Sequence, residues 1–163
     1  MMSDQSDAER TRLTAAGTYV LEGEHACHEC GCIVPVFGLM VVGPFELQGP
    51  SLLDSDDDSA ILRRPVLLPA DVSAALAERS GGHFRPEDSK TLEQRYWMNH
   101  CRECGAKIGD WYVHTPGEAF FPTTEDEMRR LCGKLLSGPH IYVEPDLAVS
   151  SWTSNWLRSV GRK

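Results

Sequence analysis

The chain has 163 residues, of which 41% are hydrophobic and 25% are charged, a composition typical of a globular domain with a buried core and not of a wholly disordered chain. Its formal net charge is −8, from 24 acidic and 16 basic side chains, and a negative field repels phosphate backbones, so nucleic acid is not the expected partner. The N-terminus lacks a secretory signal, and the apolar runs at 33–42 and 65–70 are shorter than the about 20 residues that cross a bilayer, so we expect a cytoplasmic protein with no membrane segment.

The first part of the chain predicts a tail and two strands. Residues 1–17 carry few apolar anchors, so we expect a flexible N-terminal tail followed by a single domain over 18–163. The stretch 18–21 favours a β-strand, and 33–42 is a nearly continuous apolar run rich in β-branched residues. These two predicted strands flank the first cysteine cluster. Pro35 has no N–H to donate, which predicts that the second strand begins at a sheet edge or a bulge.

We interpret residues 43–92 as an insertion between the two cysteine clusters. Its acidic segment, 54–58, cannot pack against an apolar layer and therefore predicts a surface loop. That segment lacks the glycine and the closing glutamate of an EF-hand, so a solvated run of charge is favoured over a calcium site. Apolar residues recur at helical spacing after Pro69, which predicts a short helix ended by Gly81 and Gly82.

The second cysteine cluster also lies between two predicted strands, at 93–99 and 107–114, both rich in aromatic residues. A helix is predicted after them, because Thr124 and Glu127 match a capping box and apolar residues then recur at helical spacing. Those residues are Met128, Leu131, Cys132, Leu135 and Leu136, and the helix is expected to end at Gly138 and Pro139.

Two further elements complete the predicted fold. Residues 141–143 favour a short strand, and apolar residues every three or four positions over 149–160 predict an amphipathic C-terminal helix. We therefore predict an α+β fold: a zinc β-ribbon whose two knuckles are separated by the insertion 43–92, with two or three peripheral helices.

Two copies of a C-x-x-C-G motif carry the clearest chemical signal. They are Cys27-His28-Glu29-Cys30-Gly31 and Cys101-Arg102-Glu103-Cys104-Gly105. Two residues between the cysteines let both sulfurs face one ion, and the glycine allows a positive φ that brings backbone N–H groups toward sulfur. The two motifs supply four thiolates, the ligand set preferred by a structural Zn²⁺ ion. We predict one structural zinc ion bound by Cys27, Cys30, Cys101 and Cys104.

Other interpretations explain these cysteines less well. A redox C-x-x-C pair usually opens a helix after a strand, and core cysteines without a metal do not explain a repeated motif with its glycine. Cys32 could replace a ligand, although the repeated spacing favours Cys27 and Cys30. Because four thiolates leave no position for water or substrate, we expect the metal to hold the fold and not to catalyse.

The remaining candidate ligands fit a metal site less well. His28 and His100 adjoin cysteines and are interpreted as outer-shell or exposed residues. Cys132 falls on the apolar face of its predicted helix, which indicates a buried, inert thiol. No metal-binding spacing is found for His25, His83, His114 or His140.

The sequence around the second knuckle resembles a known family. Residues 96–114 read YWMNHCRECGAKIGDWYVH, with Phe120-Phe121-Pro122 downstream and the first C-x-x-C-G motif ahead of an apolar strand. This pattern resembles a family of short bacterial and phage zinc-ribbon proteins of unassigned function. The resemblance covers about residues 18–122. It implies a split ribbon with the same four cysteine ligands, and it implies no activity.

No catalytic motif is found in the sequence, whether a phosphate-binding glycine loop, H-E-x-x-H, G-x-S-x-G or a zinc deaminase pattern. Asp110, His114 and Glu118 could meet in a cleft, but a solvated strand end explains them better. We therefore predict a non-enzymatic, zinc-stabilised interaction or regulatory protein, an accessory or inhibitor that binds another protein. Its acidic loop favours a basic partner.

The alternative is a nucleic-acid-binding zinc ribbon. Basic and aromatic residues near the second knuckle offer that chemistry: Arg95, Tyr96, Trp97, Arg102 and Lys107. The net charge disfavours this alternative, and Trp97 and Trp111 are better explained as cover for the ribbon core. No oligomeric state follows from the sequence.

Overall fold

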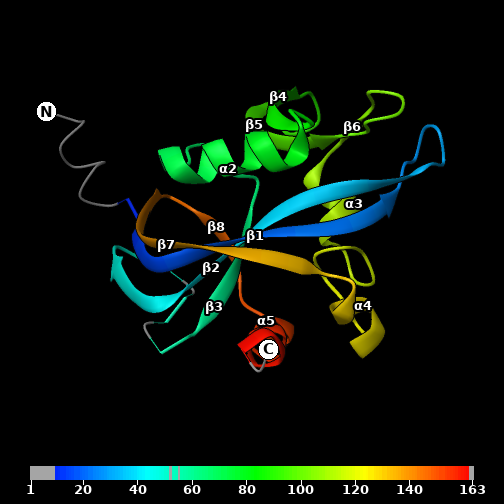
Figure 1. The fold of residues 1–163 in the computed structure, drawn as a ribbon. Coiled ribbons are helices and arrows are strands. Elements are labelled where there is room, and N and C mark those ends of the chain that lie inside the picture. The colour runs from blue at the N-terminus through cyan, green and yellow to red at the C-terminus, as the bar shows by residue number, and fades with distance from the viewer. Residues whose placement is uncertain (1–9, 52, 55, 162–163) are drawn as a thin grey trace, which may run out of the picture.

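Two antiparallel β-sheets and four helices make up the described part of the chain in the computed structural model, an α+β fold (Figure 1). Residues 10–51, 53–54 and 56–161 are described. The larger sheet has the strand order β7-β1-β2-β3-β8 and the smaller one the order β4-β5-β6. The strands are β1 (Arg12–Ala26), β2 (Ile33–Gln48), β3 (Ser59–Arg63), β4 (Phe84–Ser89), β5 (Gln94–His100), β6 (Lys107–Ile108), β7 (Cys132–Val143) and β8 (Asp146–Ala148). The helices are α2 (Ala70–Ser80), α3 (Asp110–His114), α4 (Glu125–Arg129) and α5 (Ser151–Gly161).

A long hairpin of β1 and β2 forms the centre of the larger sheet. Its register runs from Arg12 opposite Gln48 to Ala26 opposite Ile33. The two predicted strands are confirmed, and both are longer than predicted. Residues 12–17, expected in the tail, belong to β1, while residues 1–9 lie outside the described part. At Pro35 the strand β2 pairs with β1 alone among the described residues, because β3 pairs only with the later part of β2, so the predicted edge position is confirmed.

The larger sheet is covered on both faces, which explains the continuous apolar run in β2. Leu39 and Val41 belong to a core cluster that includes Val72 of α2. Met40 points to the other face, into a cluster that includes Trp156 of α5. Figure 1 shows α2 and α5 on opposite sides of this sheet. A strand buried on both faces needs apolar residues at successive positions and loses the alternation of a half-exposed strand.

The predicted insertion is an integral part of the fold. Residues 43–92 supply the end of β2, from residue 43 to Gln48, together with β3, α2 and β4. They contribute Leu62 and Phe84 to the core. The predicted helix in this segment is confirmed as α2, whose C-cap Gly81 has φ 63°. The acidic segment lies on the surface as predicted, with Asp54, Asp56 and Asp58 exposed.

The predicted helix after Thr124 is wrong over most of its length. The Thr124 side chain accepts a hydrogen bond from the Glu127 N–H (3.2 Å), as a capping box requires, but α4 ends at Arg129. Residues Cys132–Val143 then form β7, which pairs with β1. Long-range pairing overrides helical periodicity here, because β1 offers a full row of backbone partners. Cys132 is consequently exposed on a strand and not buried on a helix.

Residues 107–114 also depart from the prediction. Only Lys107–Ile108 forms a strand, and Asp110–His114 forms the helix α3, so the described chain has four helices where two or three were expected. The predicted C-terminal helix is confirmed as α5, with Trp152 and Trp156 buried and Val149 exposed ahead of it. The side chain of Val160 is not among those that the structure describes. Within the described ranges, no helix has the length and apolar character needed to cross a membrane.

Candidate metal centre

Both C-x-x-C-G motifs lie at the turns of hairpins, one between β1 and β2 and the other between β5 and β6. In the first turn the Cys27 N–H donates to the Cys32 carbonyl (2.9 Å) and the Gly31 N–H donates to the Cys27 carbonyl (2.8 Å). The second turn repeats both bonds at 2.9 and 2.8 Å. The glycines take φ 75° and 78°, the positive values that the motif predicts. The two turns are therefore structural copies of each other, and neither opens a helix as a redox pair would.

The four motif cysteines converge on one point. The sulfurs of Cys27 and Cys104 are 3.7 Å apart, as are those of Cys30 and Cys101. All four sulfurs lie within 4.8 Å of one another. A tetrahedral ion with metal–sulfur bonds of about 2.3 Å would place its ligands roughly 3.8 Å apart. These four residues could therefore hold one metal ion.

Backbone N–H groups beside the two buried sulfurs, those of Cys27 and Cys101, favour the charged, metal-binding form of these two thiols. Cys27 and Cys101 are buried, while Cys30 and Cys104 are exposed. The Glu29 N–H donates to the Cys27 sulfur (3.4 Å), and the Cys104 N–H donates to the Cys101 sulfur (3.5 Å). The second of these bonds is the main cause that lowers the pKa of Cys101 to about 7.

The other cysteines and the neighbouring histidines stay outside the cluster, as predicted. Cys32 is exposed and directs no sulfur into the group of four. The His28 ring stacks on Tyr112, with ring centroids 4.2 Å apart. His100 is buried, and its Nδ1 lies 3.1 Å from the Met98 carbonyl.

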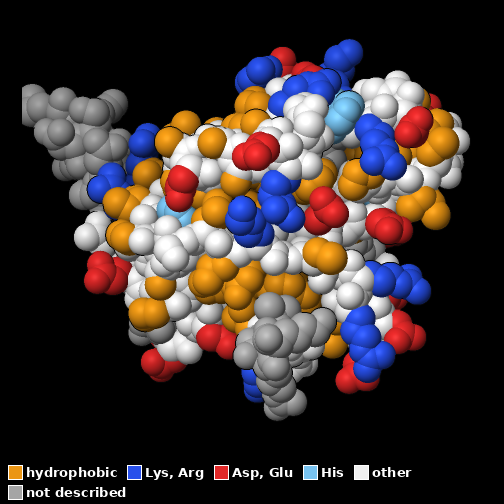
Figure 2. Space-filling model, viewed as in Figure 1, with side chains coloured by type: hydrophobic (Ala, Val, Ile, Leu, Met, Phe, Trp, Pro, Cys, Tyr) orange, Lys and Arg blue, Asp and Glu red, His pale blue; other side chains and the backbone are white. Residues whose placement is uncertain are grey.

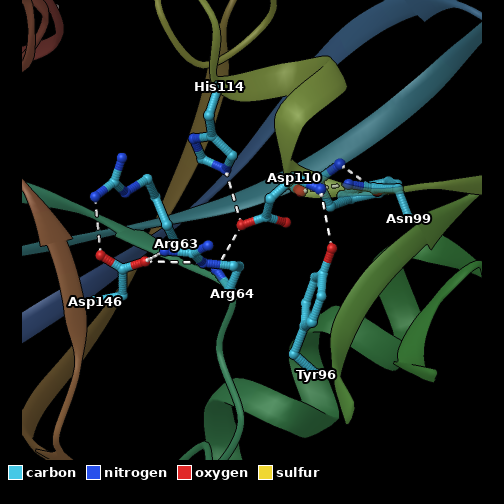
Figure 3. Close-up of polar contacts among 8 residues, drawn as sticks. Arg63, Arg64, Tyr96, Asn99, Asp110, His114 and Asp146 are labelled. Carbon is cyan, nitrogen blue, oxygen red and sulfur yellow. Dashed lines mark hydrogen bonds and ion pairs between the residues drawn. The ribbon is translucent and has the colours of Figure 1, made fainter. Parts of the chain in front are cut away.

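A buried polar cluster near α3 contradicts one sequence interpretation (Figure 3). Asp110 and His114 do not sit at a solvated strand end: their side chains are only 11% and 10% exposed, and His114 Nε2 lies 3.5 Å from Asp110 Oδ2. Burial raises the pKa of Asp110 to about 7 and lowers that of His114 to about 4. The Glu118 carboxylate instead contacts His25, at 3.4 Å from its Nδ1. Asp110 and His114 are four residues apart, a spacing that places two side chains next to each other on one face of a helix. The strand predicted for this segment left that helical indication unused.

A second buried network was not visible in the sequence. His140 joins Asp71 Oδ2 (2.8 Å) to the Thr18 hydroxyl (2.9 Å), and that hydroxyl also bonds to Tyr142 (2.6 Å). A carboxylate, a histidine and a hydroxyl in this order also form the catalytic triad of many hydrolases. Thr18, however, is completely buried, so its oxygen is closed to any substrate. The network connects α2 to the edge of the larger sheet, which is a structural role.

Comparison with protein-family models, with curated proteins and with solved structures gives no match to this chain. The resemblance to zinc-ribbon proteins therefore depends on the cysteine motifs and their flanking residues alone.

Proposed function

We propose that Cys27, Cys30, Cys101 and Cys104 bind one structural Zn²⁺ ion in a split zinc ribbon. The observation that supports this most strongly is the convergence of four sulfurs within 4.8 Å. A set of four thiolates in tetrahedral spacing is typical of zinc or of iron–sulfur sites, and a closed Cys₄ set is the usual structural zinc site. Bound zinc would leave no coordination position free for substrate.

The proposed zinc joins two parts of the fold that are far apart in sequence. One cysteine pair belongs to the β1–β2 hairpin of the larger sheet and the other to the β5–β6 hairpin of the smaller sheet. Closing such a long loop costs chain entropy, and the metal–sulfur bonds offset that cost. Zinc binding and the packing of the two sheets are therefore expected to be coupled.

We infer that this zinc-stabilised chain is a non-enzymatic interaction protein of the cytoplasm. We expect its partner to be a basic protein. The chain has net charge −8, and exposed carboxylates of the 54–58 loop extend that charge. Exposed apolar residues add contact surface: Val66, Leu67, Ile141 and Val143. Three of these residues, Leu67, Ile141 and Val143, line a hollow of about 440 Å³ beside β7 and the segment after β3. Figure 2 shows hydrophobic side chains gathered on the face that carries β7. Apolar contact surrounded by polar residues is typical of protein interfaces.

Affinity capture from a host extract tests this partner class. We expect the intact chain to retain a basic protein in a salt-sensitive manner, identified by mass spectrometry. A variant with Asp56→Asn and Asp57→Asn should retain less of it, because the acidic loop loses two charges. Retention of nucleic acid in place of protein would support the alternative function.

The nucleic-acid alternative receives less support from the side chains near the second knuckle. Tyr96 is buried, and Trp97 is half-buried with its ring against Phe84, so neither presents an open face for base stacking. The basic residues are each beside a carboxylate: Arg95 near Asp88 (3.3 Å), Arg102 near Glu103 (3.5 Å) and Lys107 near Glu87 (3.7 Å). Each of these basic side chains therefore has an acidic neighbour, which reduces the local positive field that a phosphate would meet. A filter-binding titration with DNA and RNA at low salt checks this alternative.

A further inference from the structure

A cleft of about 520 Å³ lies where β3, β5 and α3 meet, and none of the four motif cysteines lines it. Its volume is in the range of small-molecule sites. Arg63 and Arg64 line one side, and Tyr96 and Asp110 line another. Trp111 of α3 also lines it.

The charged groups of this cleft leave a local excess of positive charge. Asp146 is shared between two guanidinium groups: it accepts from Arg63 (2.9 Å) and from Nε of Arg64 (2.9 Å), with a further bond to Arg64 Nη2 (Figure 3). One carboxylate against two arginines leaves one positive charge. Between about pH 4 and 7, Asp110, which accepts from the Arg64 backbone N–H, is largely protonated, and His114 is neutral. A positive cleft in a chain of net charge −8 is a specific feature.

Arg63 also has hydrogen-bonding capacity to spare. Its Nε is buried and has no partner among the described residues, and its only ion pair there is the one to Asp146. The side chain as a whole is 39% exposed. Arginine in this state is suited to a planar or tetrahedral anion, which accepts several N–H bonds at once.

An apolar surface adjoins these donors. Trp111 is 73% exposed although it belongs to a helix whose Val113 is fully buried. The Trp111 ring contacts Tyr112 edge to face, with centroids 5.2 Å apart, and Leu92 on the lining of the cleft is also exposed. An exposed tryptophan that covers no core is a surface on which a flat ring can stack.

We propose that this cleft binds a small organic anion: a flat ring that stacks on Trp111, with one carboxylate or phosphate group that Arg63 and Arg64 hold. No cysteine lines this cleft, and the proposal does not depend on the proposed protein partner. Asp146 holds the two guanidinium groups apart and oriented, and it neutralises one of their two positive charges. The bound anion neutralises the other.

Calorimetric titration of the intact, metal-loaded protein with four probes tests the chemical class. Benzoate and adenosine 5′-monophosphate each combine a ring with an anion, of the carboxylate and phosphate type respectively. Inorganic phosphate lacks the ring, and benzyl alcohol lacks the charge. We expect saturable binding of at least one ring anion in the micromolar to millimolar range, about 10-fold tighter than either partial probe. No saturable binding by any probe, or equal binding of benzyl alcohol, would overturn the proposal.

Variants locate the binding to this cleft. Trp111→Ala and Arg63→Gln are each expected to weaken binding of the ring anion about 10-fold. Leu135→Ala is the control for Trp111→Ala, because Leu135 is 47% exposed on β7 and lies outside the cleft. Circular dichroism confirms that each variant is folded. Unchanged affinity in both cleft variants would contradict the assignment.

The pH dependence gives an independent readout with benzoate, whose charge is constant between about pH 6 and 8. Asp110 faces Arg64, His114 and Tyr96, with Arg63 and Asp146 nearby. Of these groups, Asp110 alone is expected to change charge in this range, and its carboxylate repels the anion as the pH rises. Benzoate affinity should fall from pH 6 to 8, and Asp110→Asn should remove that fall. A pH-independent affinity in the native chain would contradict the proposed role of Asp110.

Discussion

The side-chain amide of Asn99 takes the place of a neighbouring strand for Phe37. Asn99 Oδ1 accepts from the Phe37 N–H (2.8 Å), and its Nδ2 donates to the Phe37 carbonyl (2.9 Å). On this side of β2 the strand β3 pairs only with Leu39 to Val42, so the backbone of Phe37 has no strand partner there among the described residues. Because Asn99 belongs to β5, these two bonds connect the larger sheet to the smaller one beside the cysteine cluster.

Replacing Asn99 should therefore loosen the contact between the sheets. Asn99→Ala leaves one buried donor and one buried acceptor without partners, which we expect to lower the free energy of unfolding by about 3 kcal/mol. Urea denaturation measures the change. Asn155→Ala is the control: Asn155 is exposed on α5, and its loss should change stability by less than about 0.5 kcal/mol. Equal effects of the two variants would contradict the bridging role.

The cysteines provide a matched comparison within one knuckle. Cys30→Ser removes a proposed ligand, so we expect loss of the metal and a drop in stability of several kcal/mol. Cys32→Ser changes an exposed thiol two residues away, and Cys132→Ser changes one on β7. Both controls should keep the metal and the native unfolding midpoint. A chelator-release assay together with thermal unfolding distinguishes these outcomes, and metal loss in Cys32→Ser but not in Cys30→Ser would show that the ligand set is wrong.

The buried pair of Asp110 and His114 predicts opposite pH dependences for two variants. Burial keeps the proton on Asp110, with pKa about 7, and off His114, with pKa about 4. The unfolded values are about 3.9 and 6.5. The folded state thus holds the Asp110 proton more tightly, so this residue's contribution to stability falls as the pH rises from about 4 to 7. The His114 contribution has the opposite sign, and falls as the pH drops from about 6.5 to 4.

In the native chain these two contributions largely cancel between about pH 4 and 6.5, because folding only moves a proton from one residue to the other. Relative to the native chain, Asp110→Asn should therefore gain stability as the pH rises across this window, and His114→Gln should lose it. The slope is roughly 1.4 kcal/mol per pH unit as an upper limit. Urea titrations at several pH values measure it, and taking differences from the native chain removes any shared effect of metal release. Parallel curves for all three proteins would exclude the buried pair.

Gly133 of β7 makes room for the C-terminal helix. A Cβ atom at this position would lie 2.5 Å from the Trp156 ring, and Trp156 is held by its N–H bond to the Leu131 carbonyl (3.3 Å). Gly133→Ala should therefore destabilise the protein by about 1 to 3 kcal/mol through overpacking. In a protein that already carries Trp156→Leu, Gly133→Ala should cost less stability than it does in the native chain. Additive effects in the double-mutant cycle would show that the two residues do not clash.

The sequence was most informative where local chemistry decides the structure. The repeated cysteine spacing and its glycines predicted both turns, and Gly81 marked the end of α2 correctly. Local capping also placed the start of α4 at Thr124. Each of these features depends on a few adjacent residues, whose backbone requirements can be recognised without knowing their neighbours in space.

The failures came from contacts between distant parts of the chain. Cys132–Val143 has helical periodicity, yet it forms a strand because β1 is available to pair with it. Residues 12–17 have few apolar side chains and were expected in the tail. They belong to β1 because β2 and β7 are available to pair with them on either side. The cleft beside α3 could not be predicted, because Arg64, Asp110 and Asp146 meet only after both sheets have packed.

Metal analysis of the native chain tests the central claim most directly. The protein should be purified under reducing conditions without added metal, and its metal content measured by plasma mass spectrometry alongside a count of reactive thiols. We predict one zinc ion per chain, with four of the six cysteines protected until a chelator removes the ion. Stoichiometric iron in place of zinc, or a folded protein with no metal and all its thiols reactive, would contradict the proposed zinc centre.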